Sequence, residues 1–281
     1  MRNILFVPGN STKMLTSANF LGSDAVVMDL EDAVAPNEKD AARLLVRNAI
    51  RALHYQVKLG VRINALDTCY WQQDLKEILP LAPDFIMLPK TADVDSIHVL
   101  EQEVAKLEKQ YGMEKEVKFI ALLETAKGVE NAYAIARASK RVEALFLGAE
   151  DLTANLCAVR TKESSEILYS RCRLVSAARA AGIDVYDTPF TDVEDICGLE
   201  KDARLARQLG FTGKASINPR HIEGINRAFS PSEEEIAYSR EVLEIIEKAE
   251  REGHGAVSLR GKMIDAPIMA RAKYILKLAG I

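Results

Sequence analysis

Short, largely apolar runs that end in polar or charged residues recur along the chain. Each run has the length of a β-strand and is followed by residues that can take part in chemistry. The runs are 25–30 before Glu31 and Asp32, 61–63 before Asn64, 85–88 before Pro89 and Lys90, 119–123 before Glu124, and 142–147 before Gly148-Ala149-Glu150-Asp151. Buried parallel strands read as continuous apolar runs, and parallel α/β folds carry their active sites at the carboxyl ends of the strands. The pattern therefore predicts strands that converge on one site.

Stretches with helical periodicity separate these runs. Residues 94–111, for example, place Ile97, Leu100, Val104 and Leu107 on one helical face. The predicted strands are residues 3–7, 25–30, 58–63, 85–88, 118–123, 142–147, 182–187 and 210–217. The predicted helices are residues 11–21, 39–53, 70–79, 94–111, 128–138, 165–181, 193–209 and 221–229.

This alternation favours a (β/α)8 barrel, a TIM barrel, whose usual size is about 250 residues. The main alternative is an open, doubly wound sheet, which usually has a G-x-G-x-x-G turn after its first strand. The corresponding turn here is Pro8-Gly9-Asn10-Ser11, which does not match that motif.

The pattern changes after residue 229. A proline at the first helical position and three acids in the first turn predict a helix from Ser230 to about Glu252, ended by Gly253. A loop at 255–261 and a last helix to about residue 278 follow. We therefore expect a barrel catalytic domain over residues 1–229 and a C-terminal helical extension over 230–281. The extension is either a packing appendage or an arm that reaches another subunit.

Composition excludes several function classes. The chain has 281 residues and a formal net charge of −4 without a basic cluster, so neither nucleic acid nor a membrane is expected as a partner. The absence of a long apolar run predicts a cytoplasmic protein. Four scattered cysteines indicate free thiols, and four dispersed histidines argue against a zinc site. Any metal would be a hard ion held by carboxylates.

Glu124 and Asp151 are the candidate ligands for such an ion. They follow the fifth and sixth predicted strands, and neighbouring parallel strands lie about 4.8 Å apart, so the two carboxylates can share one Mg²⁺. Glu150 and Asp151 cannot both point inward if the strand period continues, and we favour Asp151. The alternative is that these acids cap helices or pair with nearby basic residues.

Arg62 is a charged residue within an otherwise apolar strand, where an unpaired charge is costly. It is interpreted as a clamp on a substrate carboxylate, or as a salt-bridge partner of Glu31 or Asp32. Lys90 is a weaker candidate, and Thr188 and Asn218 are either polar lining or turn residues. Mg²⁺, an arginine and several acids, without a nucleophile motif, fit carbon–carbon cleavage of a hydroxy acid.

A set of motifs spread over nearly the whole chain resembles the citrate lyase β subunit and the wider HpcH/HpaI aldolase, citrate lyase and malyl-CoA lyase family. The motifs are Leu5-Phe6-Val7-Pro8-Gly9, Asp29-Leu30-Glu31-Asp32-Ala33-Val34, Val61-Arg62-Ile63-Asn64-Ala65-Leu66, Leu88-Pro89-Lys90, Glu124-Thr125-Ala126-Lys127-Gly128, Gly148-Ala149-Glu150-Asp151, Gly213-Lys214-Ala215-Ser216-Ile217-Asn218-Pro219-Arg220 and Gly261-Lys262-Met263-Ile264-Asp265-Ala266-Pro267. Ser164 departs from the family pattern, which usually has a turn glycine there.

The resemblance implies a role for each matching residue. It implies Mg²⁺ on Glu124 and Asp151, carboxylate recognition by Arg62, and a supporting acidic network of Glu31 and Asp32. It further implies that Asp265 acts as an acid/base in a neighbouring subunit's site, within a trimer or larger homo-oligomer. The residues implied near the substrate and its thioester arm are Pro8, Lys90, Glu124, Gly148, Ala149 and Asn218.

The leading hypothesis is a Mg²⁺-dependent lyase that cleaves a citryl-thioester to oxaloacetate and an acetyl-thioester. Its partners would be an acyl carrier protein and the other citrate lyase subunits. One alternative is a stand-alone malyl-CoA or citramalyl-CoA lyase, and another is a non-catalytic structural barrel.

Overall fold

The computed structural model describes residues 1–252 and 257–281, which divide into two compact units, Met1–Asn226 and Arg227–Ile281. Eight parallel strands in the first unit follow one another around a closed barrel, in which β1 pairs with both β2 and β8. This confirms the predicted TIM barrel. The strands are β1 Asn3–Pro8, β2 Ala25–Asp29, β3 Lys58–Arg62, β4 Phe85–Leu88, β5 Lys118–Leu123, β6 Val142–Leu147, β7 Asp184–Asp187 and β8 Gly213–Ser216.

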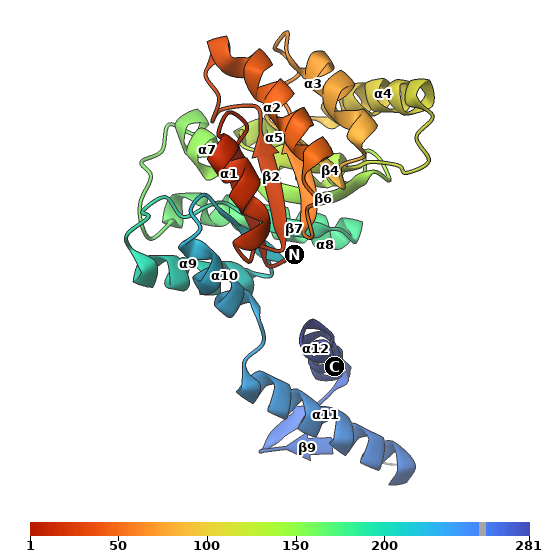
Figure 1. The fold of residues 1–281 in the computed structure, drawn as a ribbon. Helices are drawn as coiled ribbons and strands as arrows, with labels where there is room; N and C mark the ends of the chain where they lie inside the picture. Colours follow the sequence, from red (N-terminus) through yellow and green to blue (C-terminus); the bar gives the residue numbers. More distant parts are fainter. Residues whose placement is uncertain (253–256) are drawn as a thin grey trace. The chain divides into compact units, whose positions relative to one another are not determined.

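Helices surround the strands on the outside of the barrel (Figure 1). They are α1 Thr12–Ser17, α2 Lys39–Ala52, α3 Trp71–Ile78, α4 Val94–Tyr111, α5 Ala126–Glu130, α6 Ala132–Ala136, α7 Ala149–Asn155, α8 Leu168–Ala181, α9 Ile196–Leu209 and α10 His221–Phe229. Short 3₁₀ helices are also present at Ala18–Phe20, Pro36–Glu38, Leu79–Leu81 and Ser165–Ile167. Within the described part of the chain, no helix combines the length and the apolar character needed to cross a bilayer.

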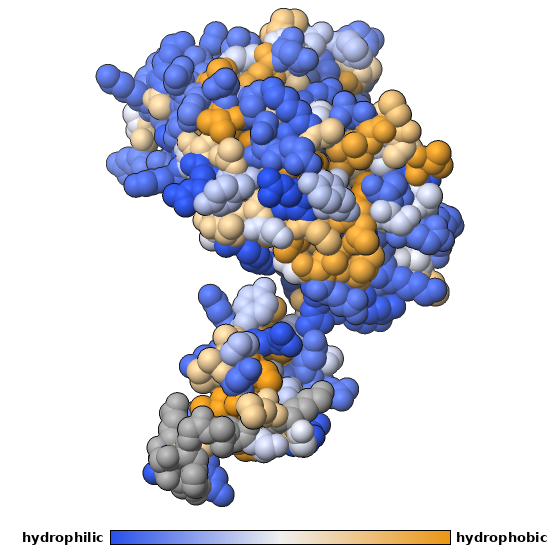
Figure 2. Space-filling model, turned by 180° about the vertical axis from the view of Figure 1, so that it is seen from behind, coloured by the Kyte–Doolittle hydropathy of each residue, from blue (hydrophilic) through white to orange (hydrophobic). Residues whose placement is uncertain are grey.

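The inside of the barrel is filled by large apolar side chains from alternate strand positions, as the period of two requires. They include Phe85, Met87, Ile120, Phe146 and Tyr186, all buried. Gly60 makes room for this packing, because a Cβ atom there would lie 2.0 Å from the ring of Phe85. Apolar patches remain on the largely hydrophilic surface seen in Figure 2.

The same alternation carries polar residues into the mouth of the barrel. Asp29, Glu124, Gly148 and Thr188 each lie two positions after an inward-facing residue of their own strand. Residues two apart share a face of a strand, so this period directs the four residues to the carboxyl end of the barrel interior.

Two stretches of the barrel differ from the sequence-based prediction. The single helix expected at 128–138 is two short helices, α5 and α6, joined at Asn131. The helix α7 was not predicted, and it begins directly after Gly148. Ser164 has φ 56°, so this serine adopts the left-handed backbone for which a glycine is usual.

The C-terminal unit contains α11 Glu233–Glu252, β9 Val257–Leu259, β10 Lys262–Ile264 and α12 Ala266–Leu278. The sequence predicted a loop over residues 255–261. From residue 257 on, where the structure describes this range, the prediction is wrong, because β9 and β10 form an antiparallel hairpin. Its two turn residues, Arg260 and Gly261, both have positive φ, as a type I′ turn requires. Gly253 and Gly255 lie outside the described residues. The core of this unit is centred on Val242, Ile264 and Ala272.

Candidate active site

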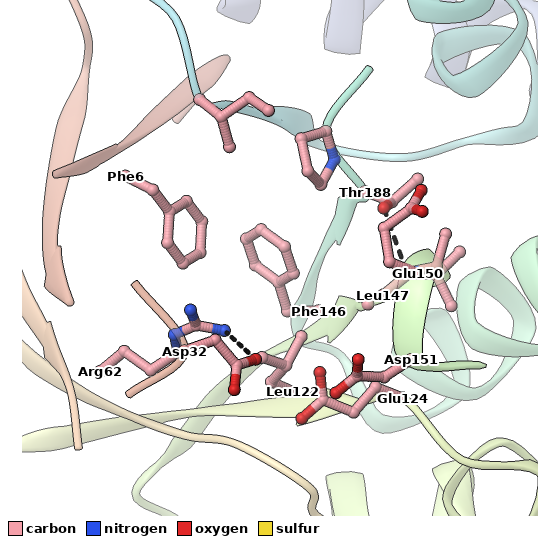
Figure 3. A pocket seen from close by; sticks show the side chains of 14 residues that line it. Phe6, Asp32, Arg62, Leu122, Glu124, Phe146, Leu147, Glu150, Asp151 and Thr188 are labelled. Atoms are coloured by element: carbon pink, nitrogen blue, oxygen red, sulfur yellow. Dashed lines mark hydrogen bonds and ion pairs between the residues drawn. The ribbon is translucent and has the colours of Figure 1, made fainter. Parts of the chain in front are cut away.

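A cavity of about 190 Å³ opens at the carboxyl end of the barrel strands (Figure 3). Apolar side chains form one part of its wall and carboxylates with one arginine form another. The lining residues are Phe6, Asp32, Arg62, Leu122, Glu124, Phe146, Leu147, Gly148, Ala149, Glu150, Asp151, Thr188, Pro189 and Ile217.

Glu124 follows β5 and is 3% exposed. Its Oε1 accepts a hydrogen bond of 2.7 Å from the backbone N–H of Lys90, the residue after the β4 end. Burial first, and then the nearby carboxylates of Glu31 and Asp151, raise the pKa of Glu124 to about 8, although the Lys90 N–H and Arg62 act to lower it. Without a cation beside it, Glu124 is therefore mainly protonated near neutral pH.

Asp151 and Glu150 both lie in the first turn of α7. The assumption that the strand period continues through them is wrong, because a helix separates successive side chains by about 100°. Asp151 and Glu124 both face the cavity (Figure 3). Glu150 also borders the cavity, but its Oε1 is 3.1 Å from Nε of Arg160, so its charge is already paired.

Arg62 ends β3 and is held by Asp29, the last residue of β2. The two residues are register partners, so their side chains extend to the same side of the sheet. Nε and Nη2 of Arg62 donate to the two oxygens of Asp29 at 2.7 and 2.6 Å, a bidentate pair. Burial alone would lower the pKa of Arg62, but the carboxylates of Asp29 and Glu31 outweigh it and raise the pKa. Arg62 is therefore a permanent cation.

The third guanidinium nitrogen of Arg62 faces the acids predicted from the sequence. Nη1 lies 3.1 Å from Oε2 of Glu31 and 3.9 Å from Oδ2 of Asp32. Asp29 was not predicted as a partner, although it follows the same apolar run as Glu31 and Asp32. The sequence signal that could have identified Asp29 is an acid at the last position of β2, because the neighbouring strand β3 ends in Arg62.

Glu31 is 4% exposed and lies between two cations. Its Oε1 is 3.3 Å from Nζ of Lys90, in addition to its contact with Arg62. Burial raises the pKa of Glu31 in spite of these cations. Lys39 fixes the backbone of this loop, because its buried ammonium donates to the carbonyl oxygens of Leu30 and Glu31 at 2.8 and 2.7 Å.

Comparison with known proteins relates this arrangement to a family. The family described as HpcH/HpaI aldolase/citrate lyase matches residues 2–219. The chain belongs to this family. The result confirms the resemblance recognised from the motifs, and with it the expectation of a carbon–carbon lyase.

Several family members resemble the chain over nearly its full length. It is 41% identical to the citrate lyase subunit beta of Leuconostoc mesenteroides subsp. cremoris, over 99% of the chain and 93% of that protein. It is 33% identical to an L-malyl-CoA/beta-methylmalyl-CoA lyase of Cereibacter sphaeroides, over 98% and 93%.

Two solved structures from Mycobacterium tuberculosis were determined with ligands. The protein CitE in complex with magnesium, acetoacetate and coenzyme A has a TM-score of 0.83 and 32% identity, over 100% of this chain and 98% of that chain. A citrate lyase beta subunit complexed with oxaloacetate and magnesium has a TM-score of 0.70 and 30% identity, over 82% and 96%.

Three predicted site residues, Gly148, Ala149 and Pro8, make their contacts through the backbone. The N–H of Gly148 donates to the carbonyl of Leu123, and the N–H of Ala149 donates to Oγ1 of Thr188. Both N–H groups are thus already engaged by the barrel. Pro8 ends β1, where its carbonyl accepts from the N–H of Ser11.

Two further predicted site residues act as local caps. Oδ1 of Asn218 accepts a hydrogen bond from the N–H of Arg220 at 2.9 Å, which fits the turn role of Asn218. Asp265 is exposed in the C-terminal unit and caps α12, where its Oδ1 accepts from the N–H of Ile268 at 3.1 Å.

A buried ionic cluster that the sequence did not reveal lies between β7, β8, α8 and α9. It consists of Arg171, Asp187, Asp202 and Lys214, two cations and two anions, none more than 6% exposed. Arg171 bridges the two aspartates, and Nζ of Lys214 lies 2.6 Å from Oδ2 of each. Each charge is close to at least two opposite charges, which compensates for its loss of water.

The described residues fit a divalent cation held by few protein ligands. Within residues 1–252 and 257–281, no three His, Cys, Asp or Glu side chains are grouped so that they alone could hold a metal. Glu124 and Asp151 offer hard carboxylate oxygens that face one cavity. Mg²⁺ is typically held by one or two carboxylates, with water and substrate oxygens completing its shell.

Proposed function

We propose that this chain cleaves a citryl-thioester to oxaloacetate and an acetyl-thioester, in a Mg²⁺-dependent reaction, as the β subunit of a citrate lyase. The observation that carries this proposal is the convergence of Glu124, Asp151 and Arg62 on one cavity. Relatives named citrate lyase subunit beta, and the related structure complexed with oxaloacetate and magnesium, support the choice of substrate.

Glu124 and Asp151 are the residues that would hold Mg²⁺. Bound Mg²⁺ supplies Lewis acidity toward the oxygens of a hydroxy acid, which is worth several kcal/mol in such reactions. The raised pKa of Glu124 supports this assignment, because a nearby cation would offset the burial and the neighbouring carboxylates that disfavour its charged form.

Arg62 binds a carboxylate of the substrate. Asp29 occupies two of its nitrogens and thereby fixes the plane of the guanidinium, while Nη1 faces the acids at the cavity. Glu31 and Asp32 keep this cation next to the site. A rigid, permanently charged donor of this kind orients the scissile bond and also stabilises negative charge that develops during cleavage.

The reaction moves one proton. The substrate hydroxyl loses its proton, the carbon–carbon bond breaks as the hydroxyl carbon becomes the ketone of oxaloacetate, and the electron pair passes to the thioester enolate. Protonation of the enolate carbon then yields the acetyl-thioester. Asp265 is the proposed acid/base for this transfer, contributed by the extension of another copy of the chain in a trimer or larger homo-oligomer.

The cytoplasmic partners of the chain in this proposal are the acyl carrier protein that bears the citryl group and the other subunits of the complex. Pro8, Lys90, Gly148, Ala149 and Asn218 would border the thioester and its arm. Gly148 and Ala149 would contribute to the shape of this part of the site and not as hydrogen-bond donors, because their N–H groups are already bonded within the chain.

A substrate comparison tests the proposal. The purified chain is incubated with citryl-CoA, malyl-CoA or citramalyl-CoA, with Mg²⁺ or with EDTA, and the products are identified by mass spectrometry. Oxaloacetate and acetyl-CoA formed only with Mg²⁺, and fastest from citryl-CoA, support it. Preferred cleavage of malyl-CoA or citramalyl-CoA would instead indicate a stand-alone lyase, which the 33% identical relative exemplifies. Cleavage of none of the three would support the structural-subunit alternative.

A further inference from the structure

The N-terminus of α7 lacks a cap from its own segment. Its N-cap residue is Gly148, which has no side chain to accept from the first helical N–H groups. Ser, Thr, Asp and Asn are common at this position because their side chains accept from these N–H groups, and a glycine there costs only a few tenths of a kcal/mol. The start of α7 carries Asp151, one of the two proposed Mg²⁺ ligands.

Glu124 explains why a glycine stands at this position. A Cβ atom on residue 148 would lie 2.7 Å from Oε2 and 2.8 Å from Cβ of Glu124. Real Cβ atoms do not approach other atoms so closely, so a capping side chain at position 148 would displace Glu124. Helix α7 therefore cannot both lie this close to Glu124 and have a capping side chain at position 148.

Thr188, from the neighbouring βα loop, supplies the missing acceptor. Its Oγ1 accepts a hydrogen bond of 3.1 Å from the N–H of Ala149, the first residue of α7 (Figure 3). The two residues are 39 positions apart, so this is a cap provided by tertiary structure. Thr188 is itself fully buried.

The buried ionic cluster holds Thr188 in turn. Nζ of Lys214 donates to the carbonyl oxygen of Thr188 at 2.7 Å, and the same ammonium is fixed by Asp187 and Asp202. A side chain with several charged partners in a buried setting has little freedom to move. The Thr188 backbone is therefore tied to β8 and α9 and not only to its own strand.

We propose that Thr188 is a positioning residue that fixes the start of α7, and with it the Asp151 carboxylate, relative to Glu124. The inference rests on the proposed function, because it takes Glu124 and Asp151 as the ligands of Mg²⁺. Residues that orient metal ligands without touching the metal commonly change its affinity by about 10- to 100-fold when they are replaced.

Calorimetric titration of Mg²⁺ into the full chain without substrate tests this role. Thr188→Val keeps the shape of the side chain but removes the acceptor, and we expect its Kd for Mg²⁺ to rise about tenfold. Thr188→Ser retains the acceptor and is expected to keep the wild-type Kd. Thr153→Val is the matched control, because it removes a hydroxyl from α7 that only donates to the carbonyls of Ala149 and Glu150.

An unchanged Kd in Thr188→Val, or an equal loss in Thr153→Val, would overturn the inference. Failure of the wild-type chain to bind Mg²⁺ would instead overturn the proposed function. The Kd refers to folded protein, so a variant that is only less stable keeps the wild-type value at a temperature where it remains folded. If Thr188→Val does not fold, a Thr188→Ser variant with a weakened Kd would also count against the proposal.

Discussion

The backbone N–H of Lys90 donates to Oε1 of Glu124 across 34 positions of sequence, at 2.7 Å. Lys90 has φ 51°, a left-handed backbone that is uncommon for a residue with a side chain. This conformation lets one residue contact both buried acids, Glu124 through its N–H and Glu31 through its ammonium. The N–H bond favours the charged form of Glu124, but burial and the neighbouring acids still raise its pKa to about 8.

The first prediction is that the affinity for Mg²⁺ rises with pH through about 8. Below its pKa of about 8, Glu124 is mainly protonated, so Mg²⁺ must displace a proton. The fraction of charged Glu124 increases by roughly tenfold between pH 7 and pH 9, and the Kd for Mg²⁺ should fall to a similar degree. Calorimetric titrations at several pH values measure this. Glu124→Gln should bind weakly at every pH, and a pH-independent Kd in the wild type would contradict the assignment.

The Glu124 carboxyl group has the opposite effect on the stability of the fold, which decreases as pH rises. A raised pKa in the folded state means that the folded chain holds the Glu124 proton more tightly than the unfolded chain does. Its contribution to stability is therefore fully present below pH 4.5 and is lost as pH rises toward about 8. Mg²⁺ should consequently raise the Tm more at pH 9 than at pH 6.

The second prediction distinguishes the role of Asp151 from that of its neighbour Glu150. Asp151→Ala should abolish Mg²⁺-dependent turnover and leave the fold intact, because Asp151 is at the surface of the cavity and not in the barrel core. Glu150→Gln is the matched variant, since Glu150 is paired with Arg160, and it should bind Mg²⁺ within about threefold of wild type. Turnover by Asp151→Ala equal to wild type would remove Asp151 from the metal site.

The third prediction concerns the packing at Gly148. In Gly148→Ala the added methyl group meets Glu124 at 2.7 to 2.8 Å, so Glu124 or α7 must shift. We expect the free energy of unfolding to drop by about 1–3 kcal/mol, the usual cost of overpacking, and Mg²⁺ binding to weaken. Urea denaturation with and without Mg²⁺ measures both effects.

Gly224→Ala serves as the control for this substitution. Its Cβ atom would make an ordinary contact of 3.4 Å with Leu199 inside a helix, where alanine is favoured over glycine by up to about 1 kcal/mol. Stability equal to or above wild type is expected. A Gly148→Ala variant as stable as Gly224→Ala would refute the packing argument.

The fourth prediction distinguishes the capping and chemical roles of Asp265. Asp265→Asn keeps an acceptor for the N–H of Ile268 but cannot transfer a proton, whereas Asp265→Ala loses both functions. Only the alanine variant should lose about 1 kcal/mol of stability. In both variants kcat should fall more than KM rises, because a proton-transfer group acts mainly in the transition state. Wild-type kcat in Asp265→Asn would leave Asp265 with its capping role alone.

Several features could be predicted from the sequence because their causes are local. Continuous apolar runs and helical periodicity depend only on neighbouring residues, and they indicated all eight barrel strands. Glu31, Glu124 and Arg62 were identified at strand ends for the same reason, whereas Asp29, the last residue of β2, was not. The helix α7 was missed because it has only seven residues and follows a glycine, so neither its length nor its start resembles an ordinary helix.

The sequence by itself determined the barrel and most of the residues at its mouth, since strand period and strand ends follow from short-range pattern. Only the tertiary structure decided how those residues are paired. Arg62 is fixed by Asp29, Glu124 by the Lys90 N–H, and α7 by Thr188, through contacts between residues 33, 34 and 39 positions apart. Such contacts depend on the register of neighbouring strands and on the closure of the barrel, and no stretch of sequence contains that information on its own.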